Sequence, residues 1–379
     1  MRRLLLTCAL LTSLFTCGCG RPDVPGLPLR STAPDFSLPG ADGRQHSLGD
    51  YADRQILALV LTANTCPAAQ LYERRIQRLH QEYRDRGVAV IAVNANRPDA
   101  LHLADLAYSD GGETLDDMTA RVNHRGLTYP YLSDGESQSL TKALGAVSLP
   151  HVFVFDRARV LQYSGRLDDD LREDRVTSSD ARDAIEALLA GRAVPRGRPV
   201  QPGCEVRGLS PREPDAALAR FQAAPVPLEM AGAEALTRLR QNGTGKLLLI
   251  NFWATWCAPC ASEFPDLEET YRRYHARGLE YVTVSVNDPG EREGVERFLR
   301  EHHASHDNRL FATSDVYGLQ AAFDPNMPAP VPFTLLLAPN GDVLYQHLGE
   351  VDFRALRRAI LAHLPDDPRY PGLQARWQP

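Results

Sequence analysis

The run Asn251-Phe252-Trp253-Ala254-Thr255-Trp256-Cys257-Ala258-Pro259-Cys260 fixes the architecture of this 379-residue chain. It completes an apolar segment that starts at Leu247 and predicts a buried strand, and a helical pattern follows from 258 to 277. Two cysteines separated by two residues, where a strand leads into a helix, are typical of a redox site. The N-terminus of a helix carries partial positive charge and free N–H groups, so a thiolate at Cys257 would be stabilised there. Cys260, one turn further on, is placed to close the disulfide and expel the product.

This segment resembles the Trp-Cys-x-x-Cys site of thioredoxin-like proteins. The longer run 256–265, Trp-Cys-Ala-Pro-Cys-Ala-Ser-Glu-Phe-Pro, resembles the extracytoplasmic TlpA/ResA group of thiol–disulfide oxidoreductases, over roughly residues 225–364. The resemblance implies that Cys257 is the attacking thiol and Cys260 the resolving thiol, with a mixed disulfide to the substrate between them. Zinc sites use the same cysteine spacing, but the nearby downstream sequence has no second Cys or His pair. We therefore expect no metal and no cofactor.

Four further residues acquire roles from the same resemblance. Glu263 lies one helical turn after Cys260, where a carboxylate could take or relay the proton of that thiol. Pro332 matches the cis-proline of the fold, and Val331 before it would offer backbone groups to an extended substrate peptide. Trp256 would cover the thiol and contact substrate, although packing at the helix end explains an aromatic residue there equally well.

The TlpA/ResA resemblance also implies partners. It suggests a reductant of oxidised target proteins, such as cytochrome c apoproteins or copper-centre assembly factors. Such a reductant needs an upstream electron donor, which we expect in the membrane. The direction of transfer depends on the environment of the disulfide, and the pair Ala258-Pro259 is only one part of that environment. A net charge of −6 gives no indication of nucleic-acid binding.

A second site candidate lies in the first half of the chain. The run 33–38, Ala-Pro-Asp-Phe-Ser-Leu, resembles the start of the redoxin and alkyl hydroperoxide reductase group. Thr65-Cys66-Pro67-Ala68-Ala69 stands where the two cysteines would be, with Ala69 in place of the second one. A peroxidatic cysteine in that group has threonine three residues before it, and here that position is Ala63, which makes peroxidase activity doubtful. Pro150 matches the cis-proline, so the resemblance in fold remains.

The role of Cys66 stays open between two alternatives. It could be a lone thiol that exchanges with Cys204 or with the second unit, since a helix N-terminus would activate it. Alternatively, the first unit is a redox-inactive structural repeat. An even number of cysteines remains after removal of a leader, which suggests a Cys66–Cys204 pair without establishing it.

The N-terminus predicts export. Arg2 and Arg3 precede an apolar run from Leu4 to Phe15, which is too short to span a bilayer and is typical of a signal peptide. The run ends in Thr-Cys-Gly-Cys-Gly at 16–20, which resembles a bacterial lipobox. We expect lipidation of Cys19, with Cys17 as the alternative, and hence a periplasmic or cell-envelope lipoprotein. An ordinary secretory peptide would also place the chain outside the cytoplasm, where disulfides persist.

The two halves repeat one plan, strand–helix–strand followed by helix–hairpin–helix, which is the thioredoxin order. We therefore predict an α/β fold with two tandem thioredoxin-like domains, each a central mixed sheet flanked by helices. The predicted divisions are a signal peptide over 1–19, a tether over 20–30, a redoxin-like domain over 31–194, a Pro-rich linker over 195–215, a TlpA/ResA-like domain over 216–364 and a tail over 365–379.

The leading functional hypothesis is a thiol–disulfide oxidoreductase that uses Cys257 and Cys260 to reduce protein disulfides. Two alternatives are retained. One is a thiol-dependent peroxidase in which Cys66 is the reactive thiol. The other is a non-catalytic module in which the first domain binds a partner and the second keeps that partner reduced.

Overall fold

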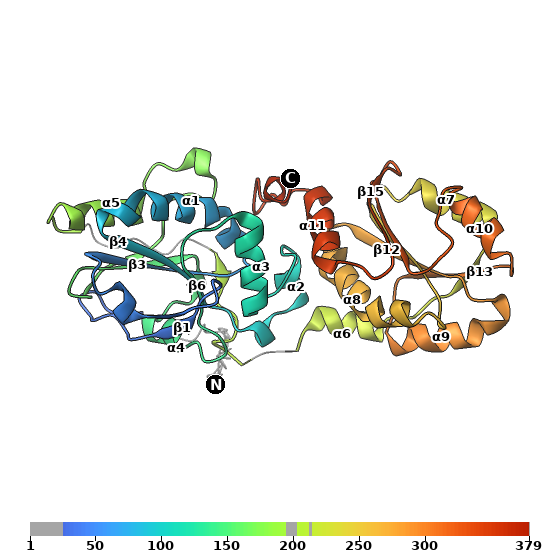
Figure 1. Ribbon diagram of the computed structural model, residues 1–379, viewed down its shortest axis with the longest axis horizontal. Helices are drawn as coiled ribbons and strands as arrows, with labels where there is room; N and C mark the ends of the chain where they lie inside the picture. Colours follow the sequence, from blue (N-terminus) through green and yellow to red (C-terminus); the bar gives the residue numbers. More distant parts are fainter. Residues whose placement is uncertain (1–25, 195–202, 212–213, 379) are drawn as a thin grey trace, which may run out of the picture.

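The computed structural model describes residues 26–194, 203–211 and 214–378, and it contains two domains side by side, each built around its own sheet (Figure 1). The proposed leader and its Cys19 lie outside the described residues. Among the described residues, no helix has the length and apolar character needed to cross a bilayer.

The first domain has a five-stranded mixed sheet. Its strands lie in the order β5-β4-β3-β7-β8, with β3 parallel to β4 and antiparallel to β7. Every residue of the central strand is buried, which explains why its sequence is apolar throughout rather than alternating. The strands are β3 (Ile56–Thr62), β4 (Val88–Asn94), β5 (Tyr131–Ser133), β7 (His151–Phe155) and β8 (Leu161–Gly165).

Helices cover both faces of this sheet. The face that carries Ala58 and Val60 packs against α1 (Pro67–Tyr83) and α5 (Asp180–Leu189). The opposite face packs against α4 (Ser139–Leu144). Two short helices lie in the segment between β4 and β5, α2 (Leu103–Leu106) and α3 (Leu115–Arg125). Two strand pairs flank the sheet, β1 (Ser37–Pro39) with β2 (Gln45–Ser47) and β6 (Ser148–Leu149) with β9 (Cys204–Glu205).

The second domain repeats the arrangement with one more strand. Its order is β10-β13-β12-β11-β14-β15, and the central β11 is again buried along its whole length. It is parallel to β12 and antiparallel to β14. The strands are β10 (Glu229–Ala231), β11 (Leu247–Trp253), β12 (Leu279–Ser285), β13 (Asp307–Phe311), β14 (Phe333–Leu337) and β15 (Val343–Leu348).

Successive side chains of β11 point alternately to the two faces of the sheet. Leu247 and Leu249 pack against the C-terminal half of α8 and against α11, whereas Leu248 and Ile250 face α7 and α10. The helices of this domain are α6 (Ala216–Ala223), α7 (Ala233–Gln241), α8 (Ala258–Tyr274), α9 (Arg292–Glu301), α10 (Val316–Phe323) and α11 (Phe353–His363). The predicted fold class, two tandem thioredoxin-like domains with mixed sheets flanked by helices, is confirmed.

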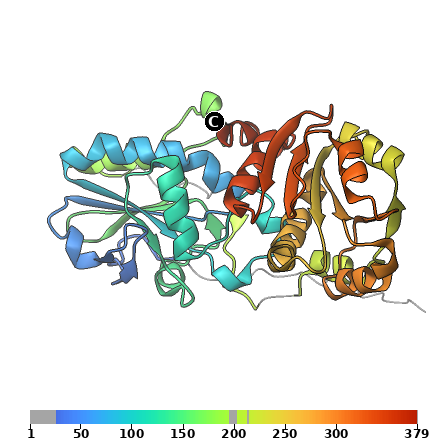
Figure 2. The same ribbon diagram turned by 45° about the vertical axis from the view of Figure 1, so that its right-hand side comes forward.

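Segment 97–128 of the first domain forms much of the contact between the domains, where α2 and α3 face α8 and α11 (Figures 1 and 2). The Tyr274 hydroxyl donates to the carbonyl oxygen of Ser109 at 2.6 Å. Nε of Arg358 donates to the buried carboxylate of Asp110 at 2.6 Å. These bonds fix the second domain on the first because each is made by groups that are largely shielded from water.

The predicted irregular tail also takes part in this contact. It contains one turn of 3₁₀ helix, Gln374–Arg376, and ends with Trp377 buried. The guanidinium of Arg376 donates to the carbonyl oxygen of Leu71 in α1 at 2.6 Å, and that of Arg125 lies 4.4 Å from the centre of the Trp377 ring. The tail therefore crosses from the second domain back to the first.

We expect the Arg358–Asp110 pair to contribute measurably to this contact. Replacing both residues singly and together by alanine should give a coupling of about 1–3 kcal/mol in the free energy of unfolding, because each single change leaves a charge without its partner. Arg238→Ala, which removes an exposed pair to Glu234 within α7, is the matched control and should change stability by less than about 0.5 kcal/mol. A coupling no larger than that control effect would contradict the assignment.

Candidate active site

Cys257 caps the N-terminus of α8 in the second domain. Its Sγ accepts a hydrogen bond from the backbone N–H of Cys260 at 3.3 Å, and the two cysteines are joined by a disulfide. Cys257 keeps 6% of its surface exposed, while Cys260 is almost fully covered. The outer sulfur is thus the one that a substrate can reach, and the helix N-terminus favours its thiolate when the disulfide is reduced.

A cis peptide bond joins Val331 and Pro332 beside this disulfide. The Val331 carbonyl oxygen lies 3.7 Å from Sγ of Cys257, so a free backbone group flanks the sulfur. Trp256 is 64% exposed, so most of its surface is available to a substrate. The structure therefore brings Trp256, Cys257, Val331 and Pro332 together at one edge, and their roles in exchange stay predictions.

Glu263 lies on the buried side of α8, three residues after Cys260. It is 2% exposed, and its carboxylate accepts hydrogen bonds from the backbone N–H of Val351 at 3.1 Å and the amide of Asn251 at 3.4 Å. Burial raises the pKa of Glu263 to about 7, since a carboxylate loses hydration there and no cation faces it closely enough to compensate. A carboxyl that changes charge near neutral pH, three residues from Cys260 on the same helix, suits proton transfer to and from that thiol.

This shifted pKa gives a pH prediction. The value rises from about 4.5 in the unfolded chain to about 7, so the stabilisation is complete below pH 4.5 and is lost as pH rises through 7. We expect the free energy of unfolding to fall by up to about 3 kcal/mol across this window in the wild type and to lack that component in Glu263→Gln. Chemical denaturation at a series of pH values measures it. Glu301→Gln, exposed at the end of α9, should retain the wild-type profile, and an unchanged profile in Glu263→Gln would refute the assignment.

Two asparagines that were not predicted as site residues hold parts of this site in place by hydrogen bonds. Asn251 interrupts the apolar run of β11, where it binds both Glu263 and the Thr334 hydroxyl. Asn287, which follows β12, accepts the backbone N–H of Thr255 at 3.0 Å and so holds the loop that leads into Cys257. The signal for Asn251 was available, because a buried amide in an apolar strand requires polar partners.

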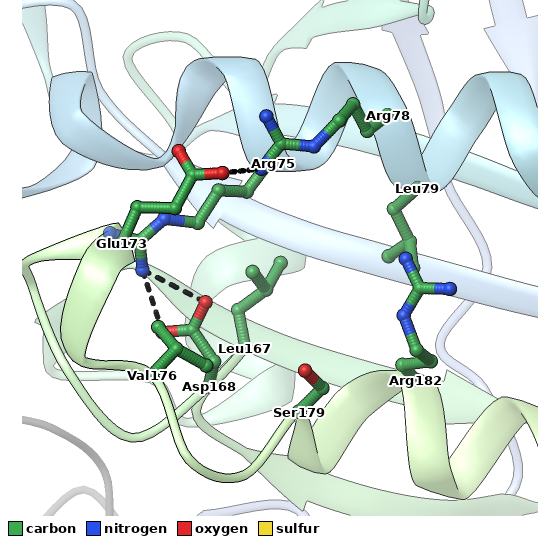
Figure 3. Close-up of a pocket in the computed structure, with 9 residues that line it drawn as sticks. All are labelled: Arg75, Arg78, Leu79, Leu167, Asp168, Glu173, Val176, Ser179 and Arg182. Carbon is green, nitrogen blue, oxygen red and sulfur yellow. Dashed lines mark hydrogen bonds and ion pairs between the residues drawn. The ribbon is translucent and has the colours of Figure 1, made fainter.

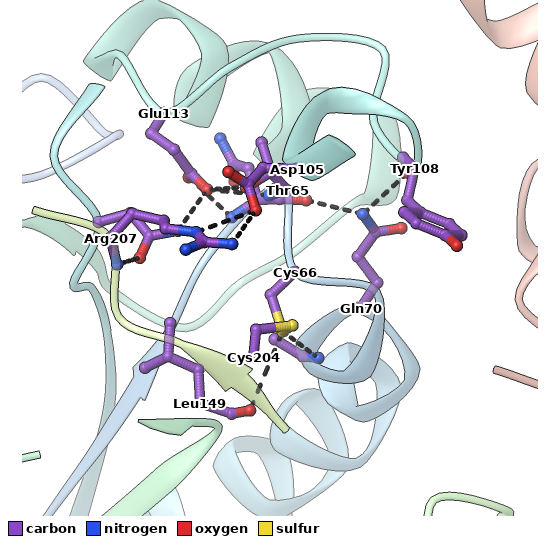
Figure 4. Close-up of a disulfide and its surroundings, with 12 residues drawn as sticks. Thr65, Cys66, Gln70, Asp105, Tyr108, Glu113, Leu149, Cys204 and Arg207 are labelled. Carbon is purple, nitrogen blue, oxygen red and sulfur yellow. Dashed lines mark hydrogen bonds and ion pairs between the residues drawn. A yellow bond between two sulfur atoms is a disulfide. The ribbon is translucent and has the colours of Figure 1, made fainter. Parts of the chain in front are cut away.

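The first domain repeats this geometry around Cys66. Cys66 caps α1, and its Sγ accepts from the backbone N–H of Ala69 at 3.3 Å, the position that Cys260 takes in the second domain. The Leu149–Pro150 bond is cis, and the Leu149 carbonyl oxygen lies 3.9 Å from Sγ. Here, however, the sulfur is bonded to Cys204, 138 residues further along the chain (Figure 4).

A buried carboxylate holds the loop before Cys66. Glu113, from segment 97–128, accepts the backbone N–H groups of Asn64 and Thr65 at 2.8 and 3.0 Å and the Thr65 hydroxyl at 2.6 Å (Figure 4). The side-chain amides of Asn94 and Asn96 also donate to the Glu113 carboxylate, at 2.7 and 3.1 Å. Burial raises the pKa of Glu113, and the hydrogen bonds from Thr65, Asn64 and Asn94 oppose that rise. Sequence analysis missed this residue because it lies 48 positions from the loop that it binds.

A pocket of about 220 Å³ lies on the first domain, between α1 and the loop that precedes α5 (Figure 3). Its charged groups are paired, Arg182 with Glu82 outside the lining and the others with one another. Arg75 donates to the Asp168 carboxylate at 2.7 Å, and Arg78 pairs with Glu173. The pocket has no cysteine in its lining, so we assign it a structural role.

Comparison with known families matches the two halves separately. Residues 29–164 match the AhpC/TSA family, and residues 214–360 match the Redoxin family. Neither match extends across the boundary between the two sheets described above.

Individual relatives match a shorter region. The thiol-disulfide oxidoreductase ResA of Oceanobacillus iheyensis is 33% identical over 103 residues, which make up 26% of this chain and 47% of that protein. ResA of Bacillus subtilis is 32% identical over 100 residues, 26% of this chain and 51% of the relative. The chain thus spans about half the length of the curated relatives it matches.

Among solved structures, a hypothetical protein from Sinorhizobium meliloti 1021 aligns with a TM-score of 0.43 and 33% identity, over 49% of this chain and 97% of that one. An uncharacterized conserved protein from Geobacillus kaustophilus aligns with a TM-score of 0.42 and 30% identity, over 48% of this chain and 93% of its own.

Proposed function

Because the chain is a tandem thioredoxin-like protein, with a first domain similar to the AhpC/TSA group and a second similar to ResA-type oxidoreductases, we propose that it is an extracytoplasmic thiol–disulfide reductase of target proteins. The observation that carries this proposal is the position of Cys257. It caps α8, is bonded to Cys260, and faces the carbonyl oxygen of Val331 before a cis-proline. Helix polarity, a sulfur that keeps some exposed surface and an unpaired strand edge together suit exchange with a protein disulfide.

The exchange proceeds in two steps. In the reduced protein the Cys257 thiolate attacks one sulfur of the target disulfide, so an S–S bond forms to the target, the target S–S bond breaks, and one target thiolate leaves. Cys260 then loses its proton, for which Glu263 is the nearest candidate acceptor on the same helix. The resulting thiolate attacks Cys257, closes the Cys257–Cys260 disulfide and releases the second target thiolate. Two electrons pass to the target.

The proposal is tested by single-turnover exchange in both directions. The full chain, reduced with dithiothreitol and desalted, is mixed with a peptide that carries one disulfide, and its products are mapped by mass spectrometry. We expect one peptide disulfide reduced for each Cys257–Cys260 disulfide formed. The oxidised chain mixed with the dithiol form of the same peptide should transfer electrons much less completely. Transfer in the opposite sense would make the protein an oxidant.

The proposed location rests on the leader-like segment, with its basic start, apolar run and Cys19 after a small residue. Radioactive palmitate fed to cells that express the chain should label the wild type and Cys17→Ser but not Cys19→Ser. Labelling that survives Cys19→Ser would refute Cys19 as the anchor.

The proposed partners are oxidised protein substrates, for which cytochrome c apoproteins and copper-centre assembly factors are the first candidates, and a membrane electron donor. Cys260→Ser should retain the attacking thiol and hold its target as a mixed disulfide. Mass spectrometry of complexes that dissociate on reduction identifies the targets. A yield no greater than that of the Cys257→Ser, Cys260→Ser double variant would contradict the proposal.

A further inference from the structure

The edge beside the cis-proline is open in the second domain and occupied in the first. In the described part of the chain, no strand pairs with Val331, and Ala329 and Pro330 before it are exposed. In the first domain, by contrast, β6 (Ser148–Leu149) pairs antiparallel with β9 (Cys204–Glu205), with Leu149 opposite Cys204. The residue that precedes the cis-proline thus pairs with the residue whose sulfur is bonded to the helix cap.

Residues 203–207 are fitted to this edge along their whole length. The backbone N–H of Val206 donates to the carbonyl oxygen of Val147 at 3.1 Å, which extends the pairing beyond β9. The Val206 side chain is 3% exposed and packs into the apolar cluster beneath the edge. A side chain at Gly203 would place its Cβ 1.9 Å from the carbonyl oxygen of Leu149, so only glycine permits this approach.

Polar groups fix the end of the same segment (Figure 4). The backbone N–H of Arg207 donates to Oδ1 of Asn96 at 2.8 Å, and its carbonyl oxygen accepts from the Gln138 amide at 2.9 Å. The Arg207 guanidinium pairs with Asp105 at 2.8 Å. A Pro-rich linker that only joined two domains would not need a buried side chain, a steric requirement for glycine and a paired charge within five residues.

We infer that the cis-proline edge of the first domain is a binding site for an extended, cysteine-containing peptide strand, and that residues 203–207 occupy it as a resident substrate mimic. The backbone pairing, the pocket filled by Val206 and the disulfide to Cys66 together have the form of a mixed disulfide between a helix-cap cysteine and its substrate. The occupant that displaces the resident strand is a segment of a client protein with a small residue before its cysteine and an apolar residue two positions after it.

The only co-reactant that this exchange at Cys66 needs is a dithiol reductant. A dithiol reductant gives two electrons to the Cys66–Cys204 disulfide, becomes a disulfide itself, and leaves one thiol on each cysteine. The Cys66 thiolate can then attack a disulfide of the incoming strand, forming an S–S bond to it while the leaving thiolate carries away the electron pair. This activity is separate from that proposed for Cys257 and Cys260, because position 69 is alanine and the thiol that can resolve a mixed disulfide at Cys66 is that of Cys204.

The test uses the full chain as Cys204→Ser with Cys257 and Cys260 oxidised. The probe is a synthetic peptide of residues 203–209 whose cysteine is capped with thionitrobenzoate, and labelling of Cys66 is followed by peptide mapping. We expect this probe to label Cys66 about tenfold faster, or more, than a control probe carrying Val206→Asp, since the pocket is apolar. Adding Gly203→Ala to the protein should increase labelling further by displacing the resident strand. Gly243→Ala, which meets no atom within 4 Å, is the matched control.

Equal rates with the two probes, no labelling of Cys66, or no effect of Gly203→Ala would each overturn the inference. If Cys204→Ser does not fold, hydrogen exchange on the wild-type chain tests the inference instead. The backbone amides of Val206 and Arg207 should exchange about tenfold faster after reduction with dithiothreitol, while those of β12 should not change. Unchanged exchange at both residues would overturn the inference as well. Reduction of a peptide disulfide by the same protein, measured after its Cys257–Cys260 disulfide has been reduced, reports separately on the proposed function.

Discussion

Cys257→Ser is expected to abolish disulfide reduction by the second domain, lowering its single-turnover rate by about 10³-fold or more, because serine cannot form the S–S bond to the target. Cys260→Ser should block a different step of the reaction from the one that Cys257→Ser blocks. It retains the attacking thiol, so the first step proceeds and the mixed disulfide accumulates instead of free product. Ser262→Ala, exposed on the same helix, should keep the wild-type rate. The rates are measured by quenching with acid and separating peptide thiols from disulfides.

The difference between the two variants shows which cysteine attacks the target and which one resolves the mixed disulfide. If Cys257→Ser kept its rate and Cys260→Ser lost it, the two roles would be exchanged. The exposures make that result incompatible with the structure, since Sγ of Cys260 is covered by the helix and by Cys257. If both variants kept the wild-type rate, reduction would have to occur elsewhere, and the catalytic assignment to the second domain would be wrong.

Glu113→Ala is expected to destabilise the first domain by about 3–5 kcal/mol, because it leaves five buried donors without an acceptor. Glu113 is 1% exposed, so water cannot easily replace the lost carboxylate. Calorimetry of the full chain measures the loss. The backbone amides of Asn64 and Thr65, which donate to Glu113, should also lose protection from hydrogen exchange.

Glu136→Ala is the matched control in the same domain, since Glu136 is exposed, and it should change stability by less than about 0.5 kcal/mol. Exchange by Cys257 and Cys260 should survive Glu113→Ala, because the second domain has its own core. A loss of less than about 1 kcal/mol in Glu113→Ala would show that the loop before Cys66 does not depend on this carboxylate.

The elements with strong local signals could be predicted from the sequence to the residue. The helix Val316–Phe323 and the helix Phe353–His363 follow aspartates that cap them, and the strand Phe333–Leu337 lies between a proline and an Asn-Gly turn. The helix predicted over 258–277 ends instead at Tyr274, and its last predicted turn is a 3₁₀ helix over His275–Arg277.

Elements defined by distant contacts were missed. The strands β10 and β13 pair with each other at the edge of the sheet, and Asp307-Asn308-Arg309 at the start of β13 has no apolar pattern. The strand β9 lies in a segment that its prolines mark as a linker, and only its pairing with β6 makes it a strand.

The residues of the candidate site also divide into those that a local motif indicates and those that only distant contacts bring together. A local motif placed Cys257, Cys260 and Glu263 together on one helix, and the family resemblance added Val331 and Pro332, which lie beside them in space. By contrast, the bond between Glu113 and Thr65 and the bond between Cys66 and Cys204 join positions 48 and 138 residues apart. The even number of remaining cysteines suggested the Cys66–Cys204 pair, which the structure contains, whereas no motif in the sequence connects Glu113 with Thr65.

A thiol-trapping redox titration of the full chain, mapped by peptide mass spectrometry, tests most directly whether the second domain is a reductase. We predict a two-electron couple between Cys257 and Cys260 with a potential near or below about −250 mV, in the range of thioredoxin-type reductants. A couple near about −120 mV would make the protein an oxidant, and the absence of any couple at these cysteines would contradict the catalytic account altogether.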